Sequence, residues 1–128
     1  MKGFRNNNQI RSDRIISELK NKYPGSHVMD LDGRGLHFLA EVEPTKDHPE
    51  YDKAVEVIIK SKPHMHKKMK QKYTILSGTL QLFIENKSII LNRGDKYTIE
   101  PNLVHWATSK NECWVEIYSQ PGWTEEDH

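Results

Sequence analysis

Residues 62–78 read KPHMHKKMKQKYTILSG and are the most informative segment of the chain. This segment places His64 and His66 two positions apart, then Gln71 at the start of an alternating apolar pattern and Gly78 at its end. Side chains two positions apart on an extended backbone project from the same face, so both imidazoles can reach one ion. Taken alone, such a pair arises easily by chance in a chain with seven histidines, and a polar loop is then the simpler interpretation.

A second stretch, GDKYTIEPNLVHWATS at residues 94–109, delivers another histidine, His105, at the start of an expected strand. The order of the two stretches resembles the two sequence motifs of the cupin superfamily. The first family motif is HxH, three or four residues, Glu, six residues and Gly, and its spacing is held here by His64, His66, Gln71 and Gly78. The second is Gly, five residues, PxGxxH and an Asn three residues on, of which only Gly94 and His105 keep their identity.

The resemblance implies an all-β fold, the cupin double-stranded β-helix or jelly-roll barrel. It also implies one divalent metal site formed by His64, His66, Gln71 and His105, with Mn, Fe, Co, Ni or Zn as candidate ions. Gln71 stands where the family has a glutamate, so it offers an amide oxygen without charge and cannot act as a base. We therefore expect weaker metal binding, stronger polarisation of a bound oxygen and a preference for an anionic ligand. A barrel that has lost its metal is the alternative.

The rest of the chain predicts one β-domain with a short helix before it. Ser12 can cap a helix in which Ile15, Ile16 and Leu19 form one apolar stripe, and Tyr23-Pro24-Gly25 ends it. Residues 1–26 are thus an N-terminal arm and helix, expected to be an appendage. Residues 27–128 form the barrel domain and its C-terminal tail, because short apolar runs recur there between turn sequences.

Nine strands are predicted from these runs, at residues 27–31, 36–42, 53–61, 72–77, 79–85, 88–91, 96–99, 105–109 and 113–119. Hairpin connections are predicted at residues 32–35, 86–87, 92–95 and 110–111. Val55, Val57 and Ile59 share one face of the longest run, so we expect this face to point to the core. The charged residues 44–51 are predicted to form an exposed excursion.

Charge and cysteine content limit the class of protein. The 128 residues carry 19 basic and 18 acidic side chains, a net charge of +1, which gives no argument for nucleic acid or an anionic membrane as partner. A single cysteine, Cys113, excludes an internal disulfide and is expected to be a small buried residue. The first residues show neither a signal core nor a transit pattern, so we expect a cytoplasmic protein.

Smaller signals concern the surroundings of the motif. By strand parity Tyr73 should point into the barrel near the metal, where it either binds substrate or only packs. Six lysines around the motif could attract an anion, although a solvated outer face is favoured; these are Lys60, Lys62, Lys67, Lys68, Lys70 and Lys72. His37 is expected to be structural. The tail at residues 116–127 is similar to that of cupin-type phosphomannose isomerases, or else Trp123 simply anchors the C-terminus.

Two main functions follow from the resemblance. The first is a metal-dependent enzyme acting on a small oxygen-rich molecule, sugar-like or a carboxylate, with isomerase and dioxygenase chemistry as candidates. An isomerase would need a base other than Gln71, either Tyr73 or a residue that the sequence does not identify. The second is a non-catalytic module that binds a sugar or metabolite. A storage or scaffold role through dimerisation stays open, because cupins often form homodimers.

Overall fold

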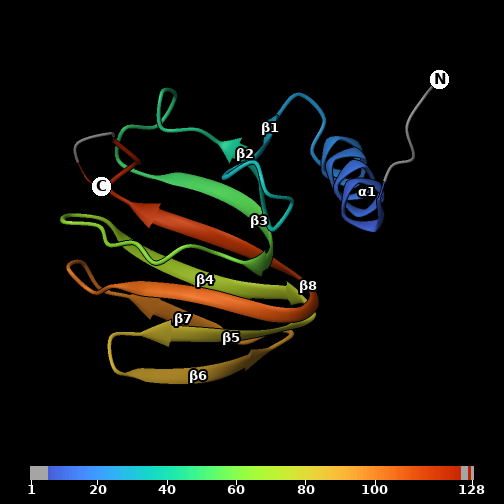
Figure 1. Ribbon diagram of the computed structural model, residues 1–128. Coiled ribbons are helices and arrows are strands. Elements are labelled where there is room, and N and C mark those ends of the chain that lie inside the picture. The colour runs from blue at the N-terminus through green and yellow to red at the C-terminus, as the bar shows by residue number, and fades with distance from the viewer. Residues whose placement is uncertain (1–5, 125–126, 128) are drawn as a thin grey trace.

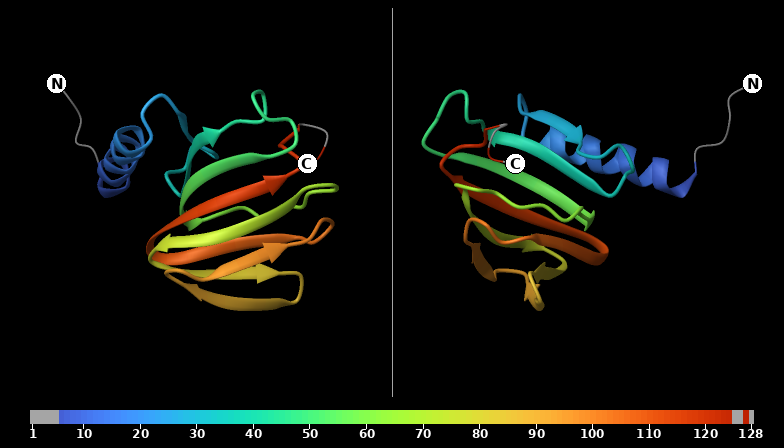
Figure 2. Two further views of the ribbon diagram at one scale, coloured as in Figure 1. Left: turned by 180° about the vertical axis from the view of Figure 1, so that it is seen from behind. Right: turned by 60° about the vertical axis from the view of Figure 1, so that its left-hand side comes forward.

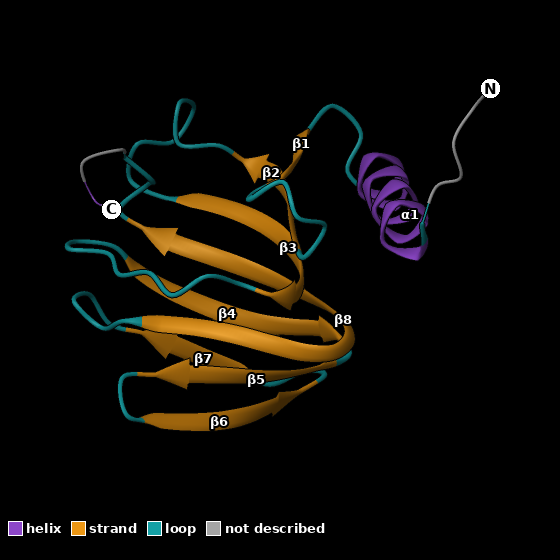
Figure 3. Cartoon of the chain, in the orientation of Figure 1, coloured by secondary structure: helices purple, strands orange, loops and turns teal. Residues whose placement is uncertain are grey.

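The computed structural model describes residues 6–124 and 127. Within this part, one helix precedes eight strands: α1 (Asn7–Lys22), β1 (His27–Asp30), β2 (His37–Glu43), β3 (Asp52–Lys60), β4 (Lys70–Ser77), β5 (Thr79–Ile84), β6 (Lys87–Asn92), β7 (Lys96–Ile99) and β8 (His105–Gln120). The predicted all-β fold with an N-terminal helix is therefore confirmed (Figures 1 and 3). No helix in the described residues has the length and hydropathy of a membrane span.

All strand pairs are antiparallel, in the order β1-β2-β3-β8-β4-β7, with β5 and β6 joined through β8. The sheet curves so that β5 and β6 lie at the opposite end from β1 and β2 (Figure 1). Its concave side holds a closed apolar core to which β3, β4, β5, β6, β7 and β8 all contribute. Two ends of the β8 strand belong to different parts of the sheet: residues 105–108 pair with β5, whereas residues 113–120 lie between β3 and β4.

The connection predicted at residues 110–111 is wrong, because this segment lies inside the continuous strand β8. The two halves of β8 do not pair with each other. Instead, the register opposite β3 shifts between Ile58 and Lys60, so that the extra residues of β8 form a bulge. A bulge bends a strand without ending it, which lets one strand serve both parts of the sheet.

The connection at residues 92–95 is also not a hairpin, since β6 pairs with β5 and β7 pairs with β4. Backbone hydrogen bonds from Gly94 N to Ile75 O and from Ile75 N to Asp95 O, of 2.9 and 3.0 Å, attach this turn to β4 instead. The hairpins at residues 32–35 and 86–87 are confirmed by the β1–β2 and β5–β6 pairs. The other strand bounds differ from the predictions by at most two residues.

The helix α1 is not an appendage, because it covers the convex face of the sheet beside β1 and β2 (Figure 2). Ile15 and Leu19 are fully buried against an outer core of Phe38, Ala40, Val55, Val57 and Trp114. The helix also begins earlier than predicted. Its N-cap is Asn6, whose side chain and that of Gln9 form a reciprocal capping box, whereas Ser12 lies inside the helix.

This second core reverses the predicted orientation of β3. Val55 and Val57 point outward to the helix, and Ala54, Glu56 and Ile58 point into the barrel. The alternating pattern predicts one buried face for each strand, but β3 contributes residues to the inner core and to the outer core, so both of its faces are covered. Consequently Glu56, between the inward-pointing Ala54 and Ile58, faces the interior of the barrel.

Candidate functional site

Two backbone contacts bring the two sequence motifs together. His64 and His105 form an isolated antiparallel bridge, with N–H to O distances of 3.0 and 2.9 Å in the two directions. Asn102 N–H donates to the carbonyl of His66 at 2.6 Å. Asn102 adopts a φ of 68°, in the left-handed region that asparagine tolerates better than most residues. The segment before β4 is thereby held against the start of β8.

The three histidines predicted as metal ligands converge. One nitrogen from each of His64, His66 and His105 lies within 4.8 Å of the others. Their ring centroids are 4.1 Å apart for His64 and His105, 5.1 Å for His64 and His66, and 5.8 Å for His66 and His105. His66 and His105 are buried and His64 is half-buried, so His64 is the most exposed member of the cluster. Residues on a loop and on a distant strand therefore meet at one point.

Backbone carbonyls orient two of these imidazoles. His64 Nδ1 donates to the carbonyl of Lys62 at 2.9 Å, and His105 Nδ1 donates to that of Leu103 at 3.1 Å. A carbonyl only accepts hydrogen bonds, so each Nδ1 carries the proton and each Nε2 carries the lone pair when the ring is neutral. Burial lowers the pKa of His105 to about 3, and the neighbouring His64 and His66 contribute to this decrease. His105 is thus held in its neutral, metal-binding form.

Gln71, the fourth predicted ligand, lies on the inward face of β4. Its Nε2 donates to Ser119 Oγ at 3.3 Å, while its Oε1 is buried without a hydrogen-bond partner among the described residues. The Nε2 of His105 is likewise buried and without a hydrogen-bond partner there. Buried polar atoms are normally satisfied, and a cation bound to such a lone pair would satisfy it. The donor set of imidazole nitrogens and one amide oxygen therefore fits a divalent transition metal.

Tyr73 points inward, as parity predicted, and is buried next to the cluster. Its ring centroid is 6.4 Å from that of His105, in an edge-on arrangement. Burial raises the pKa of Tyr73 far above its ordinary value, and the carboxylate of Glu56 adds to this effect. The phenol therefore keeps its proton at neutral pH, which argues against Tyr73 as the base.

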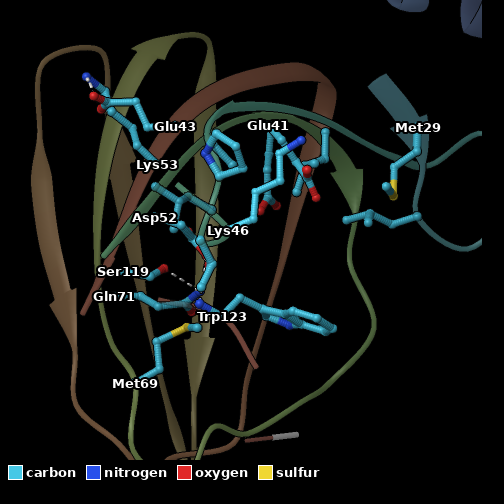
Figure 4. Close-up of a pocket in the computed structure, with 17 residues that line it drawn as sticks. Met29, Glu41, Glu43, Lys46, Asp52, Lys53, Met69, Gln71, Ser119 and Trp123 are labelled. Atoms are coloured by element: carbon cyan, nitrogen blue, oxygen red, sulfur yellow. Dashed lines mark hydrogen bonds and ion pairs between the residues drawn. The ribbon is translucent and has the colours of Figure 1, made fainter. Parts of the chain in front are cut away.

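A pocket of about 560 Å³ lies inside the barrel beside Gln71 (Figure 4). Small-molecule sites usually occupy about 300–1,000 Å³, so its size suits a metabolite. Apolar side chains form one part of its wall, including Met29, Leu39 and Met69. Its charged lining consists of Glu41, Glu43, Asp52, Glu56, Lys46 and Lys53. Four carboxylates against two ammonium groups make the pocket acidic, but of the four predicted ligands only Gln71 lines it, so the expected preference of the metal site for an anion stays a prediction.

Two segments predicted to lie outside the strands, the excursion at residues 44–51 and the C-terminal tail, complete the wall of the pocket. Pro44, Thr45 and Lys46 from the predicted excursion line the pocket, so this segment is not merely an exposed loop. Asp52 Oδ2 accepts hydrogen bonds from Thr45 Oγ1 and from Trp123 N–H, each of 2.9 Å. Burial raises the pKa of Asp52 despite these two bonds. The carboxylate thus ties the excursion and the C-terminal segment to the barrel.

Glu56 and His37 form a buried pair that the sequence does not predict. His37 Nε2 contacts Glu56 Oε1, and Glu56 lines the pocket. The only signal in the sequence is an acidic residue between two valines in the middle of a strand, a pattern that predicts a solvent-facing side chain. His37 was expected to be structural, and the structure places it beside a pocket carboxylate.

The C-terminal tail also holds the metal motif. Asp127 accepts hydrogen bonds from the backbone N–H groups of Lys68 and Met69, at 2.5 and 3.0 Å, directly after the HxH segment. Trp123, the predicted anchor, is held to Asp52 through its backbone N–H, while the residue is 48% exposed and lines the pocket. Residues 125 and 126 of the acidic tail lie outside the described residues, as do residues 1–5 of the N-terminal arm.

The remaining signals agree with the simpler interpretations. The six lysines around the motif are exposed and none lines the pocket, as expected for a solvated face. Cys113 is fully buried, and burial raises its thiol pKa to about 12. The motif glycine Gly78 has a φ of 85° and passes close to the backbone of Glu112.

Comparisons with known proteins show a shared fold at low sequence identity. No family model and no curated protein matches the chain. A variant of PAC13 from Streptomyces with uridine has a TM-score of 0.69 at 15% identity, covering 82% of this chain and 83% of that one. An RmlC-like cupin from Shewanella frigidimarina has a TM-score of 0.67 at 14% identity, covering 80% and 88%. The iron(II) form of HppE has a TM-score of 0.66 at 13% identity, covering 74% of this chain and 56% of that one. The similarity of the tail to phosphomannose isomerases is not shown by these comparisons and stays a prediction.

Proposed function

We propose that this chain, which has the cupin fold, binds one divalent transition metal and is a metal-dependent enzyme acting on a small, sugar-like molecule. The observation that carries the proposal is the convergence of His64, His66 and His105 within 4.8 Å inside the barrel. Gln71 is the proposed fourth ligand, since its buried Oε1 lacks a hydrogen-bond partner among the described residues. The bound metal would supply Lewis-acid polarisation of a substrate oxygen.

The ligand set bears on which metal is bound and how tightly. All four proposed donors are neutral, so no protein charge offsets the dication. Carbonyl groups fix the rings of His64 and His105, which lowers the cost of ordering them on binding. Imidazole and amide oxygen suit Mn, Fe, Co, Ni or Zn. Dioxygenase chemistry would require a redox-active ion of this set, whereas isomerase chemistry would not.

The pocket favours a sugar-like substrate over a carboxylate. Four carboxylates line it against two lysines, and an anionic ligand would meet like charge there. Hydroxyl groups, in contrast, can donate hydrogen bonds to carboxylates. PAC13 is described as a nucleoside dehydratase, and a variant of it has been solved with uridine, which is a sugar-containing and uncharged molecule. This similarity in fold supports the same class of ligand here.

A second candidate is a module that binds such a ligand without turning it over. It is favoured by Gln71 in the position of the family glutamate and by the high pKa of Tyr73, which leaves neither residue as a base. A homodimer and a cytoplasmic location remain predictions that bear on neither candidate.

Elemental analysis tests the metal site directly. The protein is purified without chelators or an affinity tag, and wild type is compared with the double variant His64→Ala, His66→Ala. A matched control replaces His27 and His48, which lie away from the cluster, by alanine. We expect about one equivalent of a transition metal in wild type and control, and its loss in the cluster variant. Full occupancy in the cluster variant, or no metal in wild type even after reconstitution, would refute the proposal.

A further inference from the structure

We infer that Glu56, oriented by His37, is the acid/base residue of the pocket, and that its substrate carries a C–H bond next to a carbonyl, as the open form of a sugar does. This inference rests on the proposed function, because it assigns the proton-handling group that this function lacks. Glu56 would be the catalytic residue, since it lines the pocket. His37 would be a positioning residue that acts through Glu56.

The register of β2 and β3 creates the pair. His37 lies opposite Ile58, and Leu39 lies opposite Glu56, so the four side chains share the inward face of the sheet. His37 and Glu56 are therefore diagonal neighbours, and His37 Nε2 reaches Glu56 Oε1. Both residues are buried, each with 9% of its surface exposed. One carboxylate oxygen is thus fixed by the imidazole, while the residue still forms part of the pocket wall.

Charge makes the pair suitable for proton transfer. Burial alone lowers the pKa of His37, but the carboxylate of Glu56 and the nearby Asp32 and Asp30 outweigh it, so the pKa is raised. An imidazole that titrates above its ordinary pKa can stabilise the carboxylate as a base. It can also accept part of the charge change when that carboxylate takes up a proton. Glu56 also adds to the raised pKa values of Tyr73 on β4 and of Asp52 on its own strand, both of which burial raises first.

The other ionisable groups of the pocket are less suited to this role. Asp52 already accepts two hydrogen bonds that tie loops to the barrel. Glu43 accepts a hydrogen bond from Tyr51 and lies 3.6 Å from Lys53, towards the charged rim. Glu56 is the pocket carboxylate that is both buried and paired with a second titratable side chain.

The step balances without an oxidant. The Glu56 carboxylate takes the proton from the carbon next to the substrate carbonyl, and the C–H electron pair forms a C=C bond as the carbonyl π pair moves onto oxygen. The protonated Glu56 then returns the proton to the former carbonyl carbon, while the hydroxyl on the carbon that lost its C–H becomes the new carbonyl and its proton passes to the oxyanion. In D₂O the acidic proton of Glu56 exchanges with solvent, so deuterium enters the substrate.

Deuterium incorporation into glycolaldehyde and dihydroxyacetone, followed by NMR in D₂O, is therefore the test. These probes are small enough for the pocket and carry the required C–H bond. Wild type should accelerate exchange over buffer, and Glu56→Gln should lower that acceleration by about 100-fold or more. His37→Gln should lower it about 10-fold and shift the acid limb of its pH profile to higher pH, because the charge that favours the ionised carboxylate is removed. The matched control Glu100→Gln, at an exposed carboxylate outside the pocket, should exchange like wild type.

A second measurement needs neither substrate nor metal. NMR titration of the histidine side chains should give His37 a pKa above that of a free histidine, and Glu56→Gln should lower it. If Glu56→Gln does not fold, Glu56→Asp keeps the charge but withdraws the carboxylate by one methylene, and it should still lower the exchange rate.

Metal content is measured on the same samples, so the two proposals fail separately. Metal-loaded wild type that catalyses no exchange, or exchange that Glu56→Gln leaves unchanged, overturns the role of Glu56 while the metal site stands. Exchange that depends on Glu56 in a protein without metal supports the role of Glu56 and refutes the metal-dependent function.

Discussion

Replacing Gly78 by alanine tests why the first motif ends in glycine. Gly78 joins β4 to β5 at a φ of 85°, and a Cβ built there would lie 2.5 Å from Glu112 O and 3.1 Å from Cys113 Cα. Both neighbouring atoms belong to the backbone of β8, which cannot move aside as a flexible side chain would. Gly94 provides a matched comparison, because its φ is 89° but no heavy atom lies within 4 Å of a Cβ built there.

The two substitutions share one cost and differ in another. A left-handed backbone costs an L-residue about 1–2 kcal/mol, which applies to both alanine variants. Overpacking against a fixed backbone adds about 1–3 kcal/mol at Gly78 only. The change in the entropy of the unfolded chain is the same at both positions and cancels in the comparison. We therefore expect Gly78→Ala to lose about 2–5 kcal/mol and Gly94→Ala about 1–2 kcal/mol of unfolding free energy.

Urea unfolding of the two variants and wild type, followed by circular dichroism, measures the difference. With an m value of about 1–3 kcal/mol/M, the unfolding midpoint of Gly78→Ala should lie clearly below that of Gly94→Ala. Equal losses in the two variants would refute the close approach of the β4–β5 turn to β8. The motif glycine would then be explained by backbone conformation alone.

Four further predictions concern the helix, the buried pair and the metal site. Leu19→Ala should lower the free energy of unfolding in urea by about 2–5 kcal/mol, because Leu19 is fully buried between α1 and the sheet. Ile10 is an exposed residue of the same helix, so Ile10→Ala should change this free energy by less than about 0.5 kcal/mol. Burial lowers the pKa of His37, but the Glu56 carboxylate outweighs burial, so the pKa is raised. The protonated His37 therefore stabilises the fold below about pH 6.5, and this contribution is lost as the pH rises through the raised pKa. The difference in unfolding free energy between wild type and His37→Gln should therefore be larger at acidic than at alkaline pH, and a difference that grows with pH would contradict it. Gln71→Glu should bind metal at least about 10-fold more tightly in competition with a chelating dye, because a carboxylate offsets the charge of the ion; unchanged affinity would argue against Gln71 as a ligand. Asp127→Ala should weaken metal binding about 10-fold or more in the same assay, since it frees the backbone after the HxH segment, and an unchanged affinity would show that this contact has no role in the site.

The fold class and the three histidines of the cluster could be predicted from the sequence. Both predictions depend on local properties of the chain: a period of two for strands, turn residues between them, and fixed spacing within each motif. His64 and His66 are neighbours on one extended segment, so their proximity needs no tertiary information. The family resemblance then supplied His105, and the bridge between His64 and His105 agrees with it.

Which face of each strand points to the interior depends on tertiary packing. Val55 and Val57 gave the same period-two signal for either core, and only the packing of Ile15 and Leu19 on the convex face shows that these valines point outward. That assignment turns Glu56 inward and makes it a pocket residue. Period-two patterning identifies an apolar face but not what covers it, so a strand buried on both sides hides its functional face. The acidic pocket, the pair of Glu56 and His37 and the contact from Asp127 all depend on segments far apart in the chain, whose meeting is set by the order of the strands rather than by local sequence.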